Sequence, residues 1–183
     1  MELKNVKLIV TDMDGTLLDS RHRVSDRFFE LQKALSLRGV RFAAASGRQY
    51  KSIAVKLMPI LDEVFIIAEN GGLLRHREKE LLSTPLDASL RDEVLGTLEG
   101  VQGAHTVLCG KDRAYLRPPT PAFREQLTEY YTDFKYLDRL QGFEEEIMKI
   151  AVYHFESSET HIYPAVQPYE DRLKVKVSGP NWV

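Results

Sequence analysis

The sequence predicts an α/β protein whose first half forms a parallel sheet and whose second half forms a smaller α+β unit. Three short apolar segments, residues 6–11, 40–45 and 64–68, have the length and composition of buried strands. Two helical patterns lie between them, and this alternation is typical of a parallel sheet with crossover helices. The alternation stops at residue 73, so we expect a different architecture from there on.

Residues that favour helix ends bound both helices of the first half. Ser25 is a suitable N-cap for the first helix, and Gly39 can end it. The second helix follows residues 46–48 and stops at Pro59, because proline cannot continue a helix. Ligands of parallel sheets bind beyond the carboxyl ends of the strands, so we expect the polar clusters that end these strands to converge.

The second half predicts hairpins, two clear helices and further strands. The first hairpin turns around residues 77–79 and the second around 110–112. The two helices begin at Asp87 and at Thr120-Pro121. Strands cover residues 147–155 and 173–178, and Pro164 and Pro168 shorten or break the helix between them. We therefore predict two domains, residues 1–83 and 84–183.

Composition narrows the class of protein. The chain has 183 residues, which is enough for one domain and a smaller second one. Its formal net charge is −2 and it has no long basic run, which argues against a nucleic-acid or anionic-membrane partner. The single cysteine, Cys109, fits a reducing compartment. No signal peptide or run of about 20 apolar residues is present, so we expect a cytoplasmic protein without a membrane segment.

The strongest chemical signal is Asp12-Met13-Asp14-Gly15-Thr16, directly after the first strand. Two carboxylates this close repel each other unless a cation offsets them, and Mg²⁺ prefers oxygen ligands. With Mg²⁺ held by Asp12 and Asp14, Asp12 can attack phosphorus and form an aspartyl-phosphate. Asp14 can act as general acid and base. Gly15 lets the backbone approach a phosphate, and the amide of Thr16 can donate to it.

Two other interpretations of this segment are weaker. An ordinary turn containing two aspartates fits D-x-D in general, but less well the whole combination of a buried strand and D-x-D-G-T-L. A calcium loop needs glycine at its sixth position and an acid at its twelfth, where this chain has Leu17 and Arg23. A Walker-type phosphate loop is absent from the sequence.

Two further segments are candidate phosphate or substrate contacts. Ser46, Gly47 and Arg48 end the second strand and open a helix, whose free amides bind anions well. Arg48 can add a charge-assisted bond to the substrate, although a plain N-cap followed by a surface arginine is the alternative. Asn70 is a weaker candidate, because Asn-Gly-Gly is usually only a turn. The five histidines lack metal-ligand spacing and are interpreted as surface or packing residues: His22, His76, His105, His154 and His161.

Residues 12–18, 45–48 and 68–72 together resemble the haloacid dehalogenase (HAD) superfamily, most closely its Cof-type phosphatases. The resemblance covers essentially the whole chain. It implies a Rossmann-like parallel-sheet core, of which residues 1–83 are the N-terminal part, and an inserted α+β cap in residues 84–183. It also implies Asp12 as nucleophile, Asp14 as acid/base with its backbone carbonyl on Mg²⁺, and Ser46 as a phosphoryl contact. Small phosphorylated metabolites, such as sugar or cofactor phosphates, are the implied substrates.

The family pattern continues after the cap with a lysine and a Gly-Asp-x-x-Asn-Asp segment, and this sequence stops at Val183 before either. We therefore expect a chain truncated before the C-terminal core motifs, with weakened Mg²⁺ binding and turnover. The missing part would pair with the first strand, so residues 6–11 would form an exposed apolar edge.

Two functions follow from these expectations. The first is a Mg²⁺-dependent phosphatase that hydrolyses small phosphorylated metabolites through an aspartyl-phosphate. The alternative is a catalytically impaired fragment that binds phosphate or a partner, or that self-associates through the first-strand edge. Transfer of the phosphoryl group to another metabolite instead of water also stays open.

Overall fold

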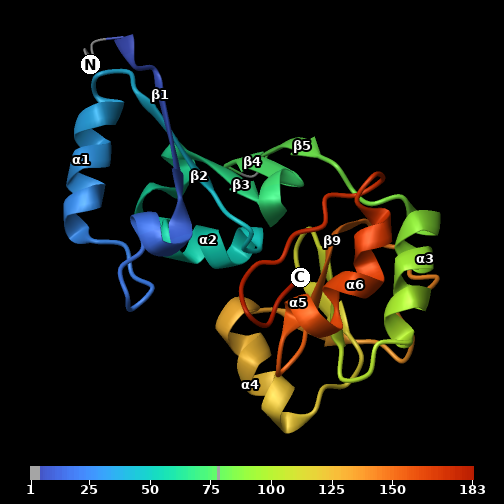
Figure 1. Cartoon of the computed structure of the whole chain (residues 1–183). Helices are drawn as coiled ribbons and strands as arrows, with labels where there is room; N and C mark the ends of the chain where they lie inside the picture. Colours follow the sequence, from blue (N-terminus) through green and yellow to red (C-terminus); the bar gives the residue numbers. More distant parts are fainter. Residues whose placement is uncertain (1–4, 78) are drawn as a thin grey trace. The chain divides into compact units, whose positions relative to one another are not determined.

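The chain divides into two compact units, Met1–Thr84 and Pro85–Val183. The computed structural model describes residues 5–77 and 79–183, and each unit contains its own sheet (Figure 1). Every described helix falls short of the length and apolar content that crossing a membrane requires.

The sheet of the first unit contains five strands in the order of the sequence. Strands β1 (Leu8–Asp12), β2 (Arg41–Ala45) and β3 (Val64–Ala68) are parallel. Strands β4 (Leu73–His76) and β5 (Lys79–Ser83) continue the sheet as an antiparallel hairpin. The predicted parallel sheet is therefore confirmed, although β1 begins later than expected and extends to Asp12. Glu78, within the predicted hairpin turn, lies outside the described residues.

Two crossover helices connect the parallel strands. Helix α1 (Asp26–Ser36) begins as expected at Ser25, whose hydroxyl accepts a hydrogen bond from the Phe28 amide at 3.2 Å. Helix α2 (Tyr50–Lys56) is followed by the 3-10 helix η3 (Met58–Glu63), which has Pro59 in its first turn. Because strands in sequence order have right-handed crossovers, both helices lie on the same face of the sheet.

Strand β1 lies at the edge of its sheet, as the sequence predicted. One face of β1 is covered, since Ile9 pairs with Phe42, whose ring lies 5.0 Å from the Phe28 ring of α1. The opposite face carries Leu8 and Val10, which are 50% and 52% exposed. This open apolar strand distinguishes the first unit from the second.

The second unit is built on a four-stranded sheet with the order β8-β7-β6-β9. Strands β6 (His105–Gly110) and β7 (Ala114–Leu116) form the predicted hairpin, and β9 (Ile147–Tyr153) pairs antiparallel with β6. The short strand β8 (Phe134–Tyr136), which the sequence analysis did not predict, pairs parallel with β7.

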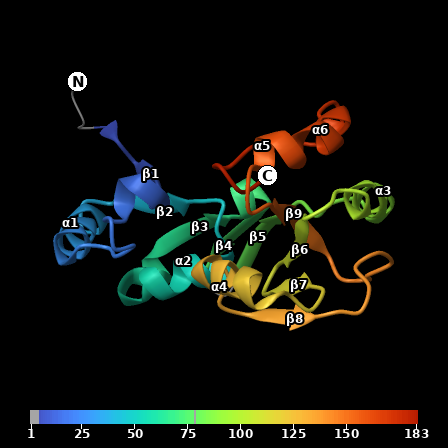
Figure 2. The ribbon, with the colours of Figure 1, turned by 60° about the horizontal axis from the view of Figure 1, so that its bottom comes forward.

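Helices cover both faces of this second sheet (Figure 2). Helix α4 (Pro121–Tyr130) places Phe123 and Leu127 against Val107 and Leu116 on one face. Helix α3 (Ala88–Glu99) packs on the other face, beside the short helices α5 (Ser158–His161) and α6 (Tyr163–Val166) and the 3-10 helix η5 (Gln167–Tyr169). The broken helix that the two prolines predicted is thus confirmed.

The strand predicted for residues 173–178 is wrong, because this segment does not join the sheet. The free edge of β9 is occupied instead by the last residues of the chain. The Val152 amide donates to the Val183 carbonyl at 2.9 Å, the Val183 amide donates back at 3.0 Å, and the His154 amide donates to Asn181 at 2.9 Å. Alternating Leu, Lys and Val residues therefore produced a strand-like pattern at residues that pair with no described strand.

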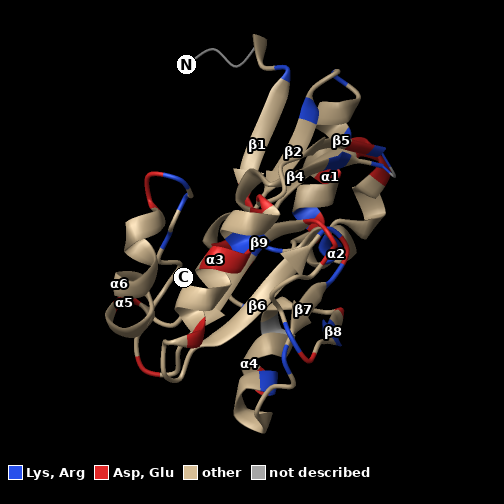
Figure 3. Ribbon diagram, turned by 90° about the vertical axis from the view of Figure 1, so that its right-hand side faces the viewer, with Lys and Arg blue, Asp and Glu red and all other residues tan. Residues whose placement is uncertain are grey.

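Charged residues are mixed over both units. Lysine and arginine lie among aspartate and glutamate on the described elements (Figure 3), in keeping with the net charge of −2.

Candidate active site

Asp12 is the last residue of β1 and pairs in register with Ala45, the last residue of β2. The chain then forms a tight turn, closed by a hydrogen bond from the Leu18 amide to the Met13 carbonyl at 2.8 Å. Gly15 has φ 70°, a left-handed conformation that favours glycine. Met13 is fully buried and anchors the turn, which leaves Asp12, Asp14, Gly15 and Thr16 exposed around it.

The loops after β2 and β3 are joined by backbone hydrogen bonds. The Asn70 amide donates to the Ser46 carbonyl, and the Glu69 amide donates to the Arg48 carbonyl, each at 3.1 Å. The Ser46 hydroxyl, which is nearly buried, accepts from the Arg48 amide at 3.2 Å. Ser46 and Asn70, which were predicted from two separate segments, are therefore neighbours joined by a backbone hydrogen bond.

Gly47 lies directly against the side chain of Asn70. A Cβ atom at Gly47 would come within 2.7 Å of Asn70 Oδ1, closer than real Cβ contacts. Asn70 is held in a left-handed conformation with φ 56°, which asparagine tolerates better than most residues. The close approach therefore favours glycine at position 47, and the left-handed backbone favours asparagine or glycine at position 70.

The structure connects the first predicted motif with the second through Arg48 and Asp14. Arg48 Nε lies 2.8 Å from Asp14 Oδ2, and Arg48 Nη2 lies 2.7 Å from Asp14 Oδ1, a bidentate ion pair. The Arg48 side chain is only 7% exposed, whereas that of Asp14 is 44% exposed. From the sequence, Arg48 was expected at the substrate, whereas in the structure its Nε and Nη2 atoms bind Asp14.

This ion pair stabilises the charged form of Asp14. Hydrogen bonding to Arg48 lowers the pKa of the Asp14 carboxyl below its ordinary value, although partial burial opposes the shift. A lowered pKa favours the carboxylate, which can accept a proton from water. Donation of a proton to a leaving group is therefore disfavoured, because the protonated form is less populated.

His22, interpreted from the sequence as a surface or packing residue, has a side chain that is 52% exposed, and it also contacts this pair. His22 Nδ1 lies 3.6 Å from Asp14 Oδ1 and 3.5 Å from Arg48 Nη2. Lys56 Nζ donates to the His22 carbonyl at 2.7 Å. Burial and the nearby Arg48 guanidinium lower the pKa of Lys56. The spacing of His22 and Asp14 in the sequence does not predict this contact. The contact depends on the turn that carries His22, which folds back towards Asp14.

Comparison with known proteins decides the family. Residues 9–182 match the sequence profile of the haloacid dehalogenase-like hydrolases. The chain belongs to this family. The resemblance noted in the sequence is thereby confirmed.

Similar proteins include two phosphatases. The 5-amino-6-(5-phospho-D-ribitylamino)uracil phosphatase YbjI of Escherichia coli is 29% identical over 150 residues, which cover 81% of this chain and 55% of that protein. The HMP-PP phosphatase of an Enterobacter species is 33% identical over 90 residues, covering 49% of this chain and 33% of that protein. The chain thus spans about half the length of the first of these relatives, or less for the second.

A solved HAD structure shares the fold. The haloacid dehalogenase-like hydrolase from Bacteroides thetaiotaomicron superposes with a TM-score of 0.80 at 18% identity, covering 97% of this chain and 70% of that one. At this identity the likeness shows the fold alone.

The resemblance to HAD phosphatases implies Mg²⁺, and the oxygen atoms of the Asp12 loop are its candidate ligands. Asp12 is exposed, and no ion pair to its carboxylate is formed by any residue that the structure describes. Both carboxylate oxygens of Asp14 are hydrogen-bonded to Arg48, and its backbone carbonyl is a further oxygen donor. An anionic oxygen and a carbonyl oxygen suit a hard cation, so the residues present fit Mg²⁺.

Another cluster of possible ligands is not arranged as a metal site. One ligand atom each from His154, Glu156 and His161 lies within 4.8 Å of the others. However, the two imidazole rings stack at 4.1 Å with an interplanar angle of 20°, so their in-plane lone pairs do not converge. His154 Nδ1 already accepts from the Glu156 amide at 3.2 Å and the Ser157 amide at 3.4 Å. This histidine therefore stabilises the turn before α5.

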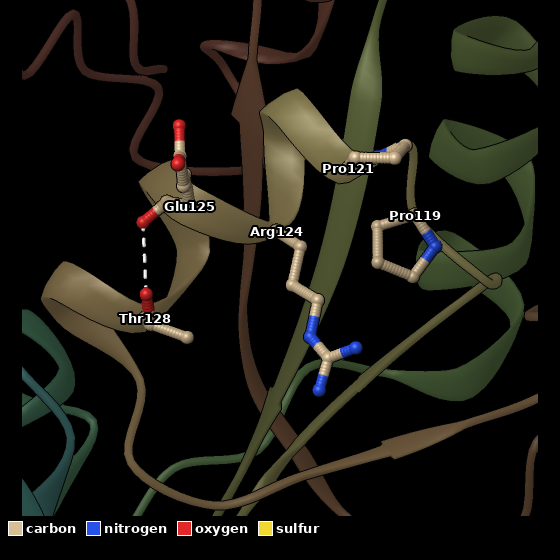
Figure 4. A pocket seen from close by; sticks show the side chains of 5 residues that line it. All are labelled: Pro119, Pro121, Arg124, Glu125 and Thr128. Atoms are coloured by element: carbon tan, nitrogen blue, oxygen red, sulfur yellow. Dashed lines mark hydrogen bonds between the residues drawn. The ribbon is translucent and has the colours of Figure 1, made fainter.

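A cavity of about 370 Å³ lies on the surface of the second unit (Figure 4). It is lined by Pro119, Pro121, Arg124, Glu125 and Thr128. These residues belong to α4 and the segment before it. The cavity has one cation among its lining residues and no pair of groups suited to acid-base or nucleophilic chemistry, so it does not compete with the Asp12 loop as a reaction site.

Proposed function

We propose that this chain carries the nucleophile and the proton-transfer residue of a Mg²⁺-dependent phosphatase acting on small phosphorylated metabolites. The observation that carries the proposal is the placement of Asp12 at the carboxyl end of β1, in register with the residue before Ser46. Two relatives are phosphatases whose names specify small phosphorylated compounds. Substrates of that class, such as sugar or cofactor phosphates, are our proposal for this chain.

The chemistry would proceed in two steps. A carboxylate oxygen of Asp12 attacks phosphorus, the bond to the ester oxygen breaks, and the departing alcohol takes a proton from Asp14. The product is an aspartyl-phosphate on Asp12. In the second step Asp14, now a carboxylate, takes a proton from water while the water oxygen attacks phosphorus, which releases phosphate and restores Asp12.

The surroundings of Asp14 affect these two steps differently. Because Arg48 lowers the pKa of Asp14, the protonated form needed in the first step is disfavoured, and the carboxylate is a weaker base in the second. Esters with good leaving groups need little proton donation, so we expect them to react fastest.

Mg²⁺ would be held by the Asp12 carboxylate and the Asp14 carbonyl, where it would offset the negative charge of the attacking carboxylate and the phosphate. The phosphate contacts that we propose come from three loops. Gly15 and the Thr16 amide follow the nucleophile, Ser46 and Gly47 follow β2, and Asn70 follows β3. Arg48 could add a contact only by giving up bonds to Asp14.

The two units take different roles in this proposal. Residues 1–83 supply the N-terminal part of a HAD core, and residues 84–183 supply a cap that selects the substrate and excludes water. We further propose a cytoplasmic location, with no nucleic-acid or membrane partner. The mixed distribution of charge supports the proposed lack of a nucleic-acid or membrane partner (Figure 3).

An alternative function is supported by the exposed apolar residues of β1. Leu8 and Val10 lie on an edge strand, and such edges pair readily with other strands. In this alternative the chain binds phosphate or a partner, or self-associates through β1, and turns over substrate poorly.

Hydrolysis of a generic phosphate ester by the purified chain, with Mg²⁺ and with EDTA, tests the primary proposal. We expect Mg²⁺-dependent release of phosphate that Asp12→Asn abolishes. Activity that survives this substitution would exclude Asp12 as nucleophile. Sedimentation of the same samples tests the alternative, which requires association or inactivity and is contradicted by an active monomer.

A further inference from the structure

We propose that Arg48 and His22 are positioning residues that hold the Asp14 carboxylate from two sides. This inference rests on the role of Asp14 in the proposed function. It assigns Arg48 to Asp14 instead of the substrate, and it gives a role to the turn formed by residues 19–24.

Arg48 is suited to fixing the plane of the Asp14 carboxylate. Its Nε and Nη2 atoms contact the two oxygens separately, at 2.8 and 2.7 Å, and this fork geometry leaves little rotational freedom. The backbone of Arg48 is itself fixed, since its amide donates to the Ser46 hydroxyl and its carbonyl accepts from the Glu69 amide. At 7% exposure, the guanidinium group is poorly placed to meet a phosphate arriving from solvent.

His22 approaches the same carboxylate from the other segment. Its Nδ1 atom lies 3.6 Å from Asp14 Oδ1, the oxygen that Arg48 Nη2 also contacts. Oδ1 therefore lies beside two nitrogen groups and Oδ2 beside one. A rotation of the Asp14 side chain would break contacts to both neighbours at once.

The turn that carries His22 is built to present this side chain. Asp19 Oδ1 accepts from the amides of Arg21 and Arg23, each at 2.9 Å, and Leu18 pairs with Val24 as an isolated bridge. At the tip of the turn, His22 adopts φ 55°, a left-handed conformation that histidine and asparagine tolerate better than most residues.

Lys56 fixes the tip from the helix side. Its Nζ atom donates to the His22 carbonyl at 2.7 Å from the last turn of α2. The orientation of Asp14 thus depends on three segments, the turn, the loop after β2 and helix α2. We call the contacts of Arg48 and His22 with the Asp14 carboxylate the clamp. Loosening the clamp should slow proton transfer and leave substrate binding unchanged.

The kinetic test compares an alkyl phosphate with p-nitrophenyl phosphate, measured as alcohol release in the first turnover with Mg²⁺ present. An alkoxide needs a proton to leave, whereas p-nitrophenolate does not. Misplacing a group by about 1 Å can cost roughly 100-fold in rate, and we expect a loss of that order for Arg48→Lys with the alkyl ester. For His22→Asn, which keeps the left-handed backbone, we expect about a 10-fold loss with the same ester.

Both variants should leave the KM of the alkyl ester and the first-turnover rate of p-nitrophenyl phosphate within about 2-fold of the unsubstituted chain. Arg21→Gln is the matched control, because Arg21 belongs to the same turn and its described contact is made by the backbone. Equal losses with both esters, or a change confined to KM, would overturn the positioning role.

A second measurement does not depend on turnover. In the unsubstituted chain the Nε–H proton of Arg48 should exchange with solvent at least about 10-fold more slowly than that of exposed Arg38. His22→Asn should speed this exchange and Asp14→Asn should speed it further. If no ester is hydrolysed, the proposed function fails while the exchange data still decide the clamp. Exchange as fast as that of Arg38 in the unsubstituted chain would sink the clamp.

Discussion

The two sheets of this protein differ in the exposure of an edge strand. In the first unit, β1 leaves Leu8 and Val10 about half exposed, at 50% and 52%. In the second unit, the edge strand β9 is paired with the last residues of the chain, and Val152 and Tyr153 are only 3% and 6% exposed.

The first unit carries the candidate active site, whereas the second unit has the more completely covered sheet. The second unit buries large side chains on both faces of its sheet, with Phe123 and Leu127 on one side and Ile162 on the other. The first unit places the polar residues of the candidate site at its strand ends and leaves part of its sheet open. We therefore expect substitutions in the first unit to change activity most, and substitutions in the second to change stability most.

The largest effect should follow from Asp12→Asn. Loss of the nucleophile removes the aspartyl-phosphate route, so phosphate release should fall at least about 1,000-fold. The urea midpoint should change little, because Asp12 is exposed and no described residue forms an ion pair with it. A loss of activity accompanied by unfolding would contradict the expectation that substitutions in the first unit mainly change activity.

Leu127→Ala should give the next largest effect, this time on stability. Leu127 is fully buried in α4, and removal of a buried leucine side chain leaves a cavity that typically costs about 3 kcal/mol. Urea unfolding followed by circular dichroism measures this loss. Leu37→Ala in the first unit, where Leu37 is 82% exposed, is the control and should stay within about 0.5 kcal/mol.

Asp14→Asn tests the ion pair through its pH dependence. Because Arg48 lowers the folded-state pKa of Asp14, the pair stabilises the fold above the ordinary pKa of 3.8 and loses its effect as pH falls below it. Asp14 is 44% exposed, so the loss at pH 7 should be about 0.5–1 kcal/mol.

Unfolding at pH 7 and at about pH 3 should therefore show the gap between Asp14→Asn and the unsubstituted chain shrinking on acidification. Exposed Asp138→Asn serves as control. A gap that widens in acid would contradict the assigned direction of the pKa shift.

The smallest effect should follow from Val10→Lys on the open face of β1. A lysine there opposes strand pairing between molecules, so any self-association should weaken while the free energy of unfolding stays within about 0.5 kcal/mol. Sedimentation velocity at several concentrations makes the comparison. Val55→Lys in α2, where Val55 is 63% exposed, is the control. Equal effects from both substitutions would remove β1 as the associating surface.

Local features of the fold could be predicted because their causes lie close in sequence. The caps of α1, α3 and α4 each use a side-chain oxygen that accepts an amide three residues later, from Ser25, Asp87 and Thr120. Such contacts are visible in the sequence as a residue type at a helix start. The strand that became β3 was predicted with its observed bounds for a similar reason, a short apolar run between polar residues.

Features that depend on distant pairing could not be predicted in this way. Arg48 meets Asp14 across 34 positions of sequence, and only the register of β1 against β2 brings them together. The strand-like alternation at residues 173–178 has no described partner, because residues 181–183 occupy the edge of β9. The three residues of β8 are too few to give a periodic signal, and they form a strand by pairing with β7.

The single thiol of the chain offers a direct probe of one half of the molecule. Cys109 is fully buried on β6, and its Sγ atom lies 3.4 Å from the Tyr131 hydroxyl. Alkylating reagents can reach this sulfur only when the second sheet opens, and the first unit has no cysteine to contribute background. The labelling rate of the native chain therefore reports breathing of residues 85–183 alone, and any ligand of the first unit that slows it would reveal energetic communication between the two halves.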